Sequence, residues 1–417
     1  MTRFETKCLS QEHDLASLLP NVDWLDDQHD DMVRLMLQLC DTNSGTMNLS
    51  GLQSVRKILE EEYGSLGGEL VVHDVDPLET VDEHGNICQQ ELGKLLHITK
   101  RRPGCPTALL CIHMDTVYPI DSGFQKCKGM PDGRINGPGV ADAKGGLVVM
   151  LYALRALEKC RLAESIGWEV IINPDEELGS PGSERFLKER ATKADFGLLF
   201  EPALPNGDLV SSRKGVGNFS FVVQGKSAHS GREFEKGRNA IVCCCQLMNE
   251  IHSFNKDPEI TFNVGRIGGG DALNVVPDLA IGRVNVRVKS RKQMQAVEQR
   301  LAELADRYSQ QDGFNVVLHG RFTSPPKELT PEIQDLQALL EQCGNTLGEK
   351  FNWQSTGGAS DGNKFAAAGL PNIDTLGPLG GAIHSDQEYV VPGSLVVKAK
   401  LCALALMAAA QTSNHTE

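Results

Sequence analysis

Two residues suited to metal chemistry, His113 and Asp115, follow the apolar run of residues 108–111. The run is short and a Tyr-Pro pair comes soon after it, which predicts a buried strand that ends in a loop. Because side chains alternate along a strand, both residues should point to the same side. There the imidazole can bind a metal while the carboxylate accepts its second N–H and fixes the ring. For an isolated pair, a structural histidine beside a turn aspartate is the commoner arrangement, so the other residues must decide.

Further carboxylates and a second histidine follow other predicted strands or lie in constrained loops: Asp142, Glu176, Glu177, Glu201 and His384. Predicted strands at 167–173 and 196–200 end just before three of them. Asp142 lies in the glycine-rich loop 136–146, which lacks the GxxxxGK[ST] order of a phosphate-binding loop. In open α/β sheets, ligands bind at the carboxyl edge of the strands. These side chains are therefore expected at one edge of one sheet.

Two histidines with several carboxylates form a mixed nitrogen and oxygen ligand set that suits Zn²⁺. With three ligands per metal and one carboxylate shared, two ions would lower the pKa of a bridging water to about 7 and polarise a carbonyl. Adjacent Glu176 and Glu177 diverge in direction, so one can bind metal while the other serves as general base. Each piece alone is more often a solvated acidic loop or a surface histidine. Their shared position at the sheet edge favours the metal site.

Composition narrows the class of protein. The 417 residues predict two domains, and 40% hydrophobic with 23% charged residues is typical of a soluble globular protein. The formal charge of −14 argues against a nucleic-acid partner. The 12 cysteines form no CxxC pair, which fits a reducing compartment. Residues 1–20 have no apolar leader and no apolar run approaches about 18 residues, so we expect a cytoplasmic protein without a membrane span.

The order of predicted elements divides the chain into two kinds of structure. Up to residue 201 strands alternate with helices, which predicts a mostly parallel sheet. Between residues 219 and 318 the order is strand, helix, strand, strand, helix, strand, as in a ferredoxin-like module. A long apolar helix at 394–411 closes the chain. We therefore predict an α/β protein with the domains 1–213, 214–325 and 326–417, the second inserted between two parts of the first.

Local patterns predict the smaller elements. Residues 23–40 and 50–63 have apolar residues at helical spacing. Ser50 is the expected N-cap of the second helix, and Gly64 closes it. Residues 373–376 predict a short strand before the glycine-rich segment that contains His384.

Five motifs in one order also carry a family resemblance: His113-Met114-Asp115, Gly139-Val140-Ala141-Asp142-Ala143-Lys144-Gly145-Gly146, Asp175-Glu176-Glu177, Glu201-Pro202 and His384-Ser385. The chain resembles the dizinc carboxypeptidase/aminoacylase family of metallohydrolases over nearly its whole length. The family includes glutamate carboxypeptidase, acetylornithine deacetylase and succinyl-diaminopimelate desuccinylase. The glutamate carboxypeptidase branch resembles it further through these segments: Asp115-Thr116-Val117-Tyr118, Gly137-Pro138-Gly139 and Thr356-Gly357-Gly358. The resemblance implies a zinc-peptidase catalytic domain with an inserted dimerisation (lid) domain.

The resemblance also assigns roles to the metal-site residues. His113, Glu201 and a shared Asp142 would hold one zinc. Glu177, His384 and the same Asp142 would hold the other, with Co²⁺ or Mn²⁺ as possible substitutes. Glu176 would be the general base, and Asp115 would orient His113. A cis peptide bond is expected at Asp142–Ala143.

The inserted module carries further implied roles. His229 resembles the histidine that reaches the partner subunit's active site and stabilises the oxyanion. Asn274, Arg287 and Gly358 match substrate-contacting positions, and an arginine fork is the natural holder of a substrate carboxylate. A homodimer through the inserted domain is expected, since its sheet would have an exposed edge. Arg213 and Lys214 form a basic pair that glutamate carboxypeptidase lacks and several deacylases carry, and they also lie at the entry to the module.

These observations predict a cytoplasmic zinc hydrolase that cleaves the amide bond to an amino acid with a free α-carboxylate. Glutamate or a related residue is the favoured leaving group, and the substrate is a small peptide or an N-acyl amino acid. Two alternatives stay open. One is an N-acyl amino acid deacylase of the acetylornithine or succinyl-diaminopimelate type, or a dipeptidase. The other is a non-catalytic, metal-dependent binding protein on the same scaffold.

Overall fold

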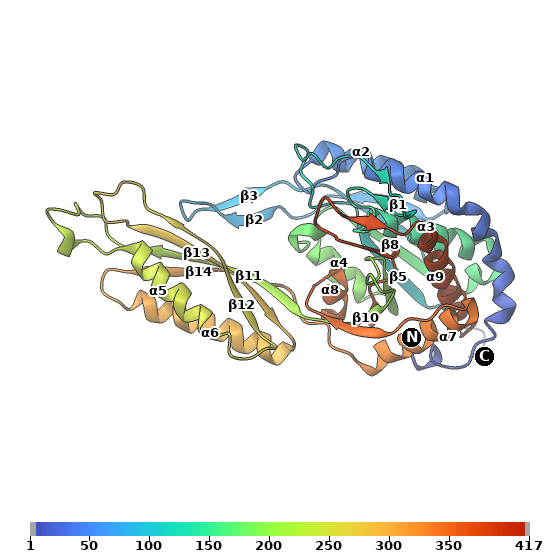
Figure 1. Cartoon of the computed structure of the whole chain (residues 1–417). Coiled ribbons are helices and arrows are strands. Elements are labelled where there is room, and N and C mark those ends of the chain that lie inside the picture. Colours follow the sequence, from blue (N-terminus) through green and yellow to red (C-terminus); the bar gives the residue numbers. More distant parts are fainter. Residues whose placement is uncertain (1–5, 413–417) are drawn as a thin grey trace.

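The computed structural model describes residues 6–412 and has a six-stranded sheet at the centre of its larger part (Figure 1). In spatial order the strands are β1 (Glu69–His73), β4 (Leu95–Lys100), β8 (Gly167–Asn173), β5 (Thr107–His113), β9 (Phe196–Leu199) and β16 (Asn372–Ile373). Strands β8, β5, β9 and β16 run parallel, whereas β4 pairs antiparallel with β8 and β1 with β4. The predicted mostly parallel sheet is confirmed.

Helices cover both faces of this sheet. They are α1 (His29–Cys40), α2 (Leu49–Gly64), α3 (Lys144–Lys159), α4 (Glu184–Ala191), α7 (Pro331–Leu347), α8 (Asp361–Ala367) and α9 (Gly393–Thr412). Leu110 and Ile112 of β5 belong to the core formed with α3 and α9, whereas Leu109 and Cys111 pack with Leu187 of α4 on the other face. Successive side chains of a strand point to opposite faces, so the apolar run 108–112 of the fully buried β5 is what a sheet covered on both sides requires.

Helix α9 is long and apolar enough to cross a membrane by length and composition, but 78% of its most apolar window is buried inside the fold. It packs against α3, α7 and α1. A helix that is apolar all round belongs in the core of a large domain. The long apolar helix predicted at the end of the chain is therefore a core helix.

The inserted module is a second, four-stranded antiparallel sheet with two helices. Its elements are β11 (Gly215–Gln224), α5 (Ala240–His252), β12 (Thr261–Gly269), β13 (Leu279–Val288), α6 (Arg291–Ser309) and β14 (Asn315–Ser324). The strand order is β12-β13-β11-β14, which leaves β12 and β14 at the edges. Helices α5 and α6 bury one face of the sheet around Phe221 and Leu301. The predicted ferredoxin-like order is confirmed.

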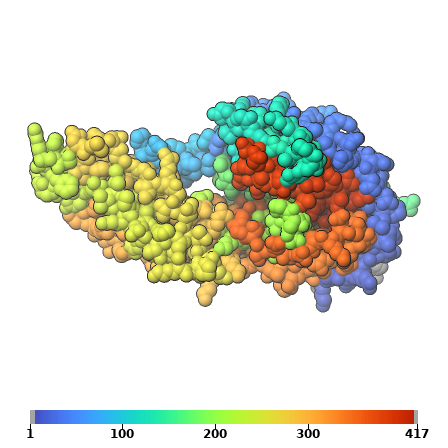
Figure 2. Space-filling model, in the orientation of Figure 1, coloured from blue at the N-terminus to red at the C-terminus, as the bar shows by residue number. Residues whose placement is uncertain are grey.

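A hairpin that the sequence analysis missed connects the two parts. Strands β2 (Leu78–Val81) and β3 (Ile87–Gln90) extend from the larger part to the inserted sheet (Figures 1 and 2). Arg283 of β13 donates to the carbonyl of Val81 at 2.9 Å, and Arg266 of β12 pairs with Glu83 at the hairpin tip. Both hairpin strands are largely exposed, so no alternating apolar pattern marks them.

Two segments join the inserted module to the rest of the chain, residues 213–215 and 324–327. We call them the crossing segments. Their backbones pair through Arg213 and Lys327, whose N–H groups donate to each other's carbonyls at 3.0 and 3.1 Å. The buried carboxylate of Asp374 forms an ion pair with Arg213, whose Nε lies 2.9 Å away, and accepts a hydrogen bond from Lys327 Nζ at 2.8 Å. The two crossing segments are therefore held side by side by a buried ion cluster.

Some local predictions were wrong. Helix α2 begins one residue before Ser50, and its N-cap is Asn48, whose side chain accepts from the Gly51 N–H at 3.1 Å. The Ser50 hydroxyl instead donates to that Asn48 side chain at 2.9 Å. Residues 23–28 form a 3₁₀ helix rather than α-helix. The short strand near residue 373 is only the two residues of β16.

Candidate active site

Two groups of potential metal ligands meet at Asp142. In the first, Nε2 of His113, at the end of β5, lies 3.1 Å from Asp142 Oδ1 and 3.7 Å from Glu201 Oε2. In the second, Nε2 of His384 lies 3.2 Å from Asp142 Oδ2 and 3.3 Å from Glu177 Oε2. Within each group the potential ligand atoms lie within 4.8 Å of one another. The structure thus brings together the two predicted sets, with Asp142 facing both histidines.

The chemistry of these residues fits a pair of divalent cations. Three carboxylates surround two imidazoles, and Oε1 of Glu177 is buried without a hydrogen-bond partner among residues 6–412. Contacts with Asp142 and Glu177 raise the pKa of His384 to about 10, and burial raises the pKa of Glu177 to about 7. Protons are thus drawn to the cluster to balance its negative charge. A mixed set of nitrogen and oxygen ligands suits zinc, which would replace those protons.

Asp115 holds two parts of the site together. The Nδ1 atom of His113 lies 3.0 Å from the backbone carbonyl of Asp115 and 3.4 Å from its carboxylate. The carboxylate accepts from Thr46 Oγ1 at 2.7 Å and from the backbone N–H groups of Glu176 and Glu177, each at 3.2 Å. The closer acceptor for the imidazole is therefore the carbonyl. The carboxylate mainly anchors the turn that follows β8.

Glu176 and Glu177 are consecutive residues of the 3₁₀ turn Glu176–Leu178, directly after β8. Glu177 points to His384, while burial and the nearby Glu201 carboxylate raise the pKa of Glu176 well above its usual range. A raised pKa is what a carboxylate needs to take up a proton near neutral pH. The turn therefore offers one ligand and one proton acceptor side by side.

The third acidic residue of this motif, Asp175, faces inward. It accepts from the Gly182 N–H at 2.7 Å and the Ser183 N–H at 3.1 Å, and also from the Ser183 hydroxyl. Burial raises the pKa of Asp175 to about 6. Asp175 thus shapes the loop between β8 and α4 and does not belong to either metal group.

The loop that carries Asp142 is held by Glu388, a residue distant in the sequence that the sequence analysis missed. Its carboxylate accepts from the N–H groups of Gly139, Ala141 and Asp142 at 3.1, 2.9 and 3.0 Å, and from the Tyr118 hydroxyl at 2.7 Å. The predicted cis peptide bond at Asp142–Ala143 is present. The only available signal was the position of Glu388 four residues after His384.

The residues predicted to contact the substrate or a second chain lie in two separate places. Arg287 Nη1 donates to the carbonyl of Gly357 at 2.6 Å, and Arg213 Nη1 donates to that of Gly358 at 3.3 Å. His229 and Asn274 are both exposed, and the carbonyl of Asn274 accepts from the residue after His229 at 3.0 Å. They lie beyond the end of the ten-residue β11, a length of roughly 30 Å from the crossing segments. Arg287 and Gly358 therefore come together, whereas His229 and Asn274 stay away from the metal groups of their own chain.

Several known proteins are similar to this chain in sequence or in fold. A model of peptidase family M20/M25/M40 matches residues 109–408. Carboxypeptidase G2 from Pseudomonas sp. (strain RS-16) is 30% identical over 386 residues, which cover 90% of this chain and 89% of that protein. A succinyl-diaminopimelate desuccinylase from Methylibium petroleiphilum is 28% identical over 274 residues, covering 62% and 69%. The crystal structure of an M20 family metallo-carboxypeptidase from Sulfolobus solfataricus has the same fold, with a TM-score of 0.70 at 16% identity, covering 92% and 100%.

Proposed function

Because the chain belongs to peptidase family M20/M25/M40 and is thus a metallohydrolase acting on peptide bonds, we propose that it is a two-zinc amidase. Its proposed substrate has an amide nitrogen that belongs to an amino acid with a free α-carboxylate. Glutamate is the favoured leaving group, by the resemblance of residues 115–118, 137–139 and 356–358 to the glutamate carboxypeptidase branch, and the likeness to carboxypeptidase G2 over 89% of that protein's length supports carboxypeptidase activity. The alternative is deacylation of an N-acyl amino acid, supported by the likeness to a succinyl-diaminopimelate desuccinylase.

The observation that carries the proposal is the pair of ligand groups that share Asp142, with Glu176 beside them. We assign His113, Asp142 and Glu201 to one zinc and Asp142, Glu177 and His384 to the other. When bound, two such ions acidify a water and polarise a carbonyl oxygen. The Glu176 carboxylate takes the proton of the attacking water and then gives it to the leaving nitrogen. Zinc in the cell, with Co²⁺ or Mn²⁺ as substitutes, is part of this proposal.

The contacts of Arg287 and Arg213 support recognition of a carboxylate near the Gly357–Gly358 loop. Both guanidinium groups donate to this loop, so positive charge converges where a substrate carboxylate would lie. Arg213 is held by the buried Asp374, whereas Arg287 is partly exposed. We therefore propose Arg287 as the residue that binds the α-carboxylate, with Gly358 as a further contact in the same chain and Asn274 as a contact supplied by a second chain. Arg213 would anchor the crossing segment.

An apolar depression next to Glu177 supports an apolar acyl group on the other side of the scissile bond. The cavity has a volume of about 320 Å³, and Glu177 contributes to its wall. Its apolar side chains are unusually exposed, with Ile120 at 67% and Met47 at 45% of their full accessible surface. Exposed apolar patches of this kind mark binding grooves. An acyl chain that extends from the metal groups would cover these side chains.

The position of His229 supports a homodimer through the inserted module. His229 is exposed and belongs to a part of the chain that lies far from its own metal groups, so a second chain is needed to make it useful. Edge strands β12 and β14 offer unpaired backbone for such a contact. We propose that the domains 1–213 and 326–417 form the catalytic part and that 214–325 forms the dimerisation and lid domain.

All 12 cysteines are unpaired, which supports a cytoplasmic location.

A substrate panel on the zinc-loaded protein tests the proposal. Pteroyl-glutamate, N-acetyl amino acids, N-succinyl-diaminopimelate and dipeptides should be compared by their kcat/KM values. We expect hydrolysis of substrates with a free α-carboxylate and none of their amidated forms. Turnover that is equal for both forms would overturn the proposed role of Arg287. A protein that binds zinc but hydrolyses none of the panel would favour the binding-protein alternative.

A further inference from the structure

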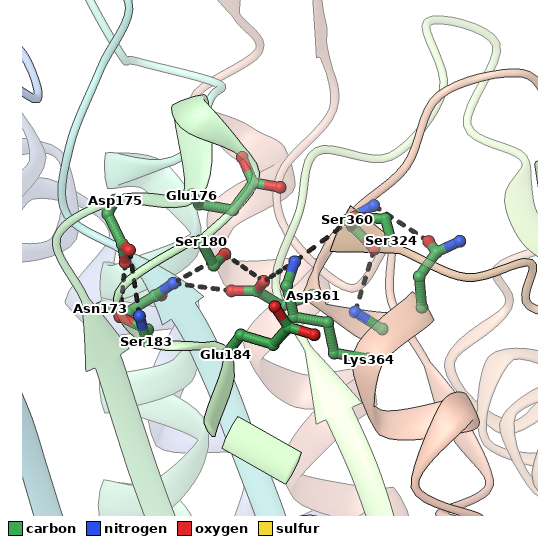
Figure 3. Close-up of polar contacts among 12 residues, drawn as sticks. Asn173, Asp175, Glu176, Ser180, Ser183, Glu184, Ser324, Ser360, Asp361 and Lys364 are labelled. Carbon is green, nitrogen blue, oxygen red and sulfur yellow. Dashed lines mark hydrogen bonds and ion pairs between the residues drawn. The ribbon is translucent and has the colours of Figure 1, made fainter. Parts of the chain in front are cut away.

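A buried carboxylate outside both metal groups, Asp361, lies beneath the turn that carries Glu176 (Figure 3). Asp361 is the first residue of α8 and is only 2% exposed. It accepts hydrogen bonds from the Ser180 hydroxyl, from Asn173 Nδ2 at 2.7 Å and from Lys364 Nζ at 3.0 Å. All three partners are fully buried. Such a completely enclosed polar network forms only where its geometry is closely fixed.

Two of these partners flank Glu176, the proposed general base, in the sequence. Asn173 is the last residue of β8, Ser180 follows the 3₁₀ turn, and Glu176 lies between them. The backbone of Ser180 has a φ of 51°, which non-glycine residues adopt rarely and only when the surroundings enforce it. The N–H of Ser180 also donates to the carbonyl of Asp175 at 2.8 Å. A single carboxylate therefore ties down both ends of the loop that aims Glu176.

The same turn of α8 also holds the crossing segments. The side-chain amide of Asn363 donates to the carbonyl of Lys214 at 3.1 Å and to that of Pro325 at 2.7 Å. Lys364 Nζ reaches Ser324 Oγ at 3.4 Å while it pairs with Asp361. Each crossing segment is thus bound to α8 by a buried side chain. The turn that carries Glu176 and the two crossing segments therefore meet at α8.

We propose that Asp361 is a positioning residue that sets the orientation of Glu176 through Ser180 and Asn173, and that α8 links this orientation to the crossing segments. The proposal rests on the assignment of Glu176 as the base. A base must be held within a fraction of an ångström of its productive position, and a shift of about 1 Å can cost on the order of 10²-fold in rate. If Asp361 served stability alone, its loss would lower the melting temperature and leave the rate of the folded enzyme unchanged.

The test replaces the carboxylate while keeping its shape, in Asp361→Asn. In the zinc-loaded enzyme we expect kcat to fall roughly 10- to 100-fold with KM nearly unchanged and with both metal ions retained. Hydrogen–deuterium exchange in the peptide covering residues 174–182 should become faster. An unchanged kcat, or a kcat lost only in proportion to lost metal, would overturn the proposal.

Glu169→Gln is the matched control. Glu169 is also a fully buried carboxylate of β8, held by Arg101 and Arg190 near the opposite end of that strand from Asn173. We expect this change to lower the melting temperature while kcat and exchange at 174–182 stay at wild-type values. If it lowered kcat as much as Asp361→Asn at equal metal content, the effect would be general destabilisation and the proposal would fail.

Ser180→Ala supplies a second, milder variant. It removes the hydroxyl that donates to Asp361 and decides the question if the Asp361→Asn chain does not fold. In a double-mutant cycle on kcat, the two changes should be strongly non-additive because they break one connection. Additive effects would contradict the proposal. The exchange measurement needs no substrate, so faster exchange at 174–182 still supports the link if the substrate panel fails, and unchanged exchange rejects it.

Discussion

The six-stranded sheet and the sheet of the inserted module differ in how completely they assemble the residues assigned to them. Around the six-stranded sheet, four residues from separate segments of the sequence, His113, Glu177, Glu201 and His384, lie within a few ångströms of the shared Asp142 carboxylate. In the inserted sheet, Arg287 reaches the Gly357 loop, but His229 and Asn274 remain exposed at a distance. One half of the proposed site is complete in a single chain, and the other is not.

The difference follows from how each part is held. Three of the candidate metal ligands, His113, Glu177 and Glu201, lie at or just after the buried parallel strands β5, β8 and β9, and further buried groups such as Asp115 and Glu388 anchor the loops around the site. The inserted module is attached by two crossing segments and by its contacts with the β2–β3 hairpin, and both groups of candidate metal ligands lie outside it. Metal binding is therefore expected to depend on residues of the catalytic part alone. Rate and specificity should depend on the inserted module and on a second chain.

The largest expected effect is that of Asp142→Asn. Asp142 faces both histidines, so its change should remove both metal ions and lower kcat/KM by on the order of 10³-fold or more. Elemental analysis after dialysis measures the bound zinc. Asp132→Asn, at an exposed turn, serves as the control and should keep two ions. If Asp142→Asn retained both ions at wild-type affinity, the shared-ligand arrangement would be wrong.

The next effect concerns His229 and the second chain. His229→Ala should keep both metal ions but lower kcat about 10²- to 10³-fold, as expected for the loss of an oxyanion donor. Mixing it in equal amounts with Glu176→Gln should restore about a quarter of wild-type activity, because half the dimers are hybrids with one intact site. Activity assays across mixing ratios measure this. No recovery after subunit exchange would mean that His229 does not act across a dimer.

The pH dependence of metal binding should reflect the histidine–carboxylate contacts. In metal-stripped protein the pKa of His384 is about 10, above its usual value of about 6.5. These contacts thus stabilise the stripped fold fully below pH 6.5, and the contribution is lost as the pH rises through about 10. Zinc requires a neutral imidazole, so binding at pH 7 should release at least one proton per chain.

The affinity for zinc should then rise about tenfold per pH unit for each proton released. Glu177, with a pKa of about 7, adds to this release near neutral pH. Calorimetry in buffers of different ionisation enthalpy counts the protons. Zinc binding without proton release would show that the cluster is not protonated in the way its contacts imply.

The smallest expected effect is at the apolar depression. Ile120→Asp should lower kcat/KM roughly 3- to 10-fold for substrates with an apolar acyl group and hardly change it for acetyl substrates. Ile87→Asp is the matched control, since Ile87 is similarly exposed at 55% but lies on the hairpin. Equal losses for both acyl classes would remove the depression from the proposed acyl site.

Much of this arrangement could be predicted from the sequence because strands and motifs are local. The apolar run before His113 and the elements of the inserted module follow from side-chain periodicity, and the family was evident from five short motifs. What the sequence did not reveal are connections over long separations. Asn173 and Asp361 are 188 residues apart, and Ala141 and Glu388 are 247 apart. A buried carboxylate that anchors a loop has no periodic signal, and the β2–β3 hairpin lacks an apolar face.

The proposed reaction depends most directly on Glu176 as the base beside two metal ions. The decisive measurement is kcat of Glu176→Gln with its best substrate, on protein shown by elemental analysis to hold two zinc ions per chain. We predict full metal content and a loss of about 10²- to 10⁴-fold in kcat, with KM little changed. A doubly metallated variant that works at the wild-type rate would contradict the central claim.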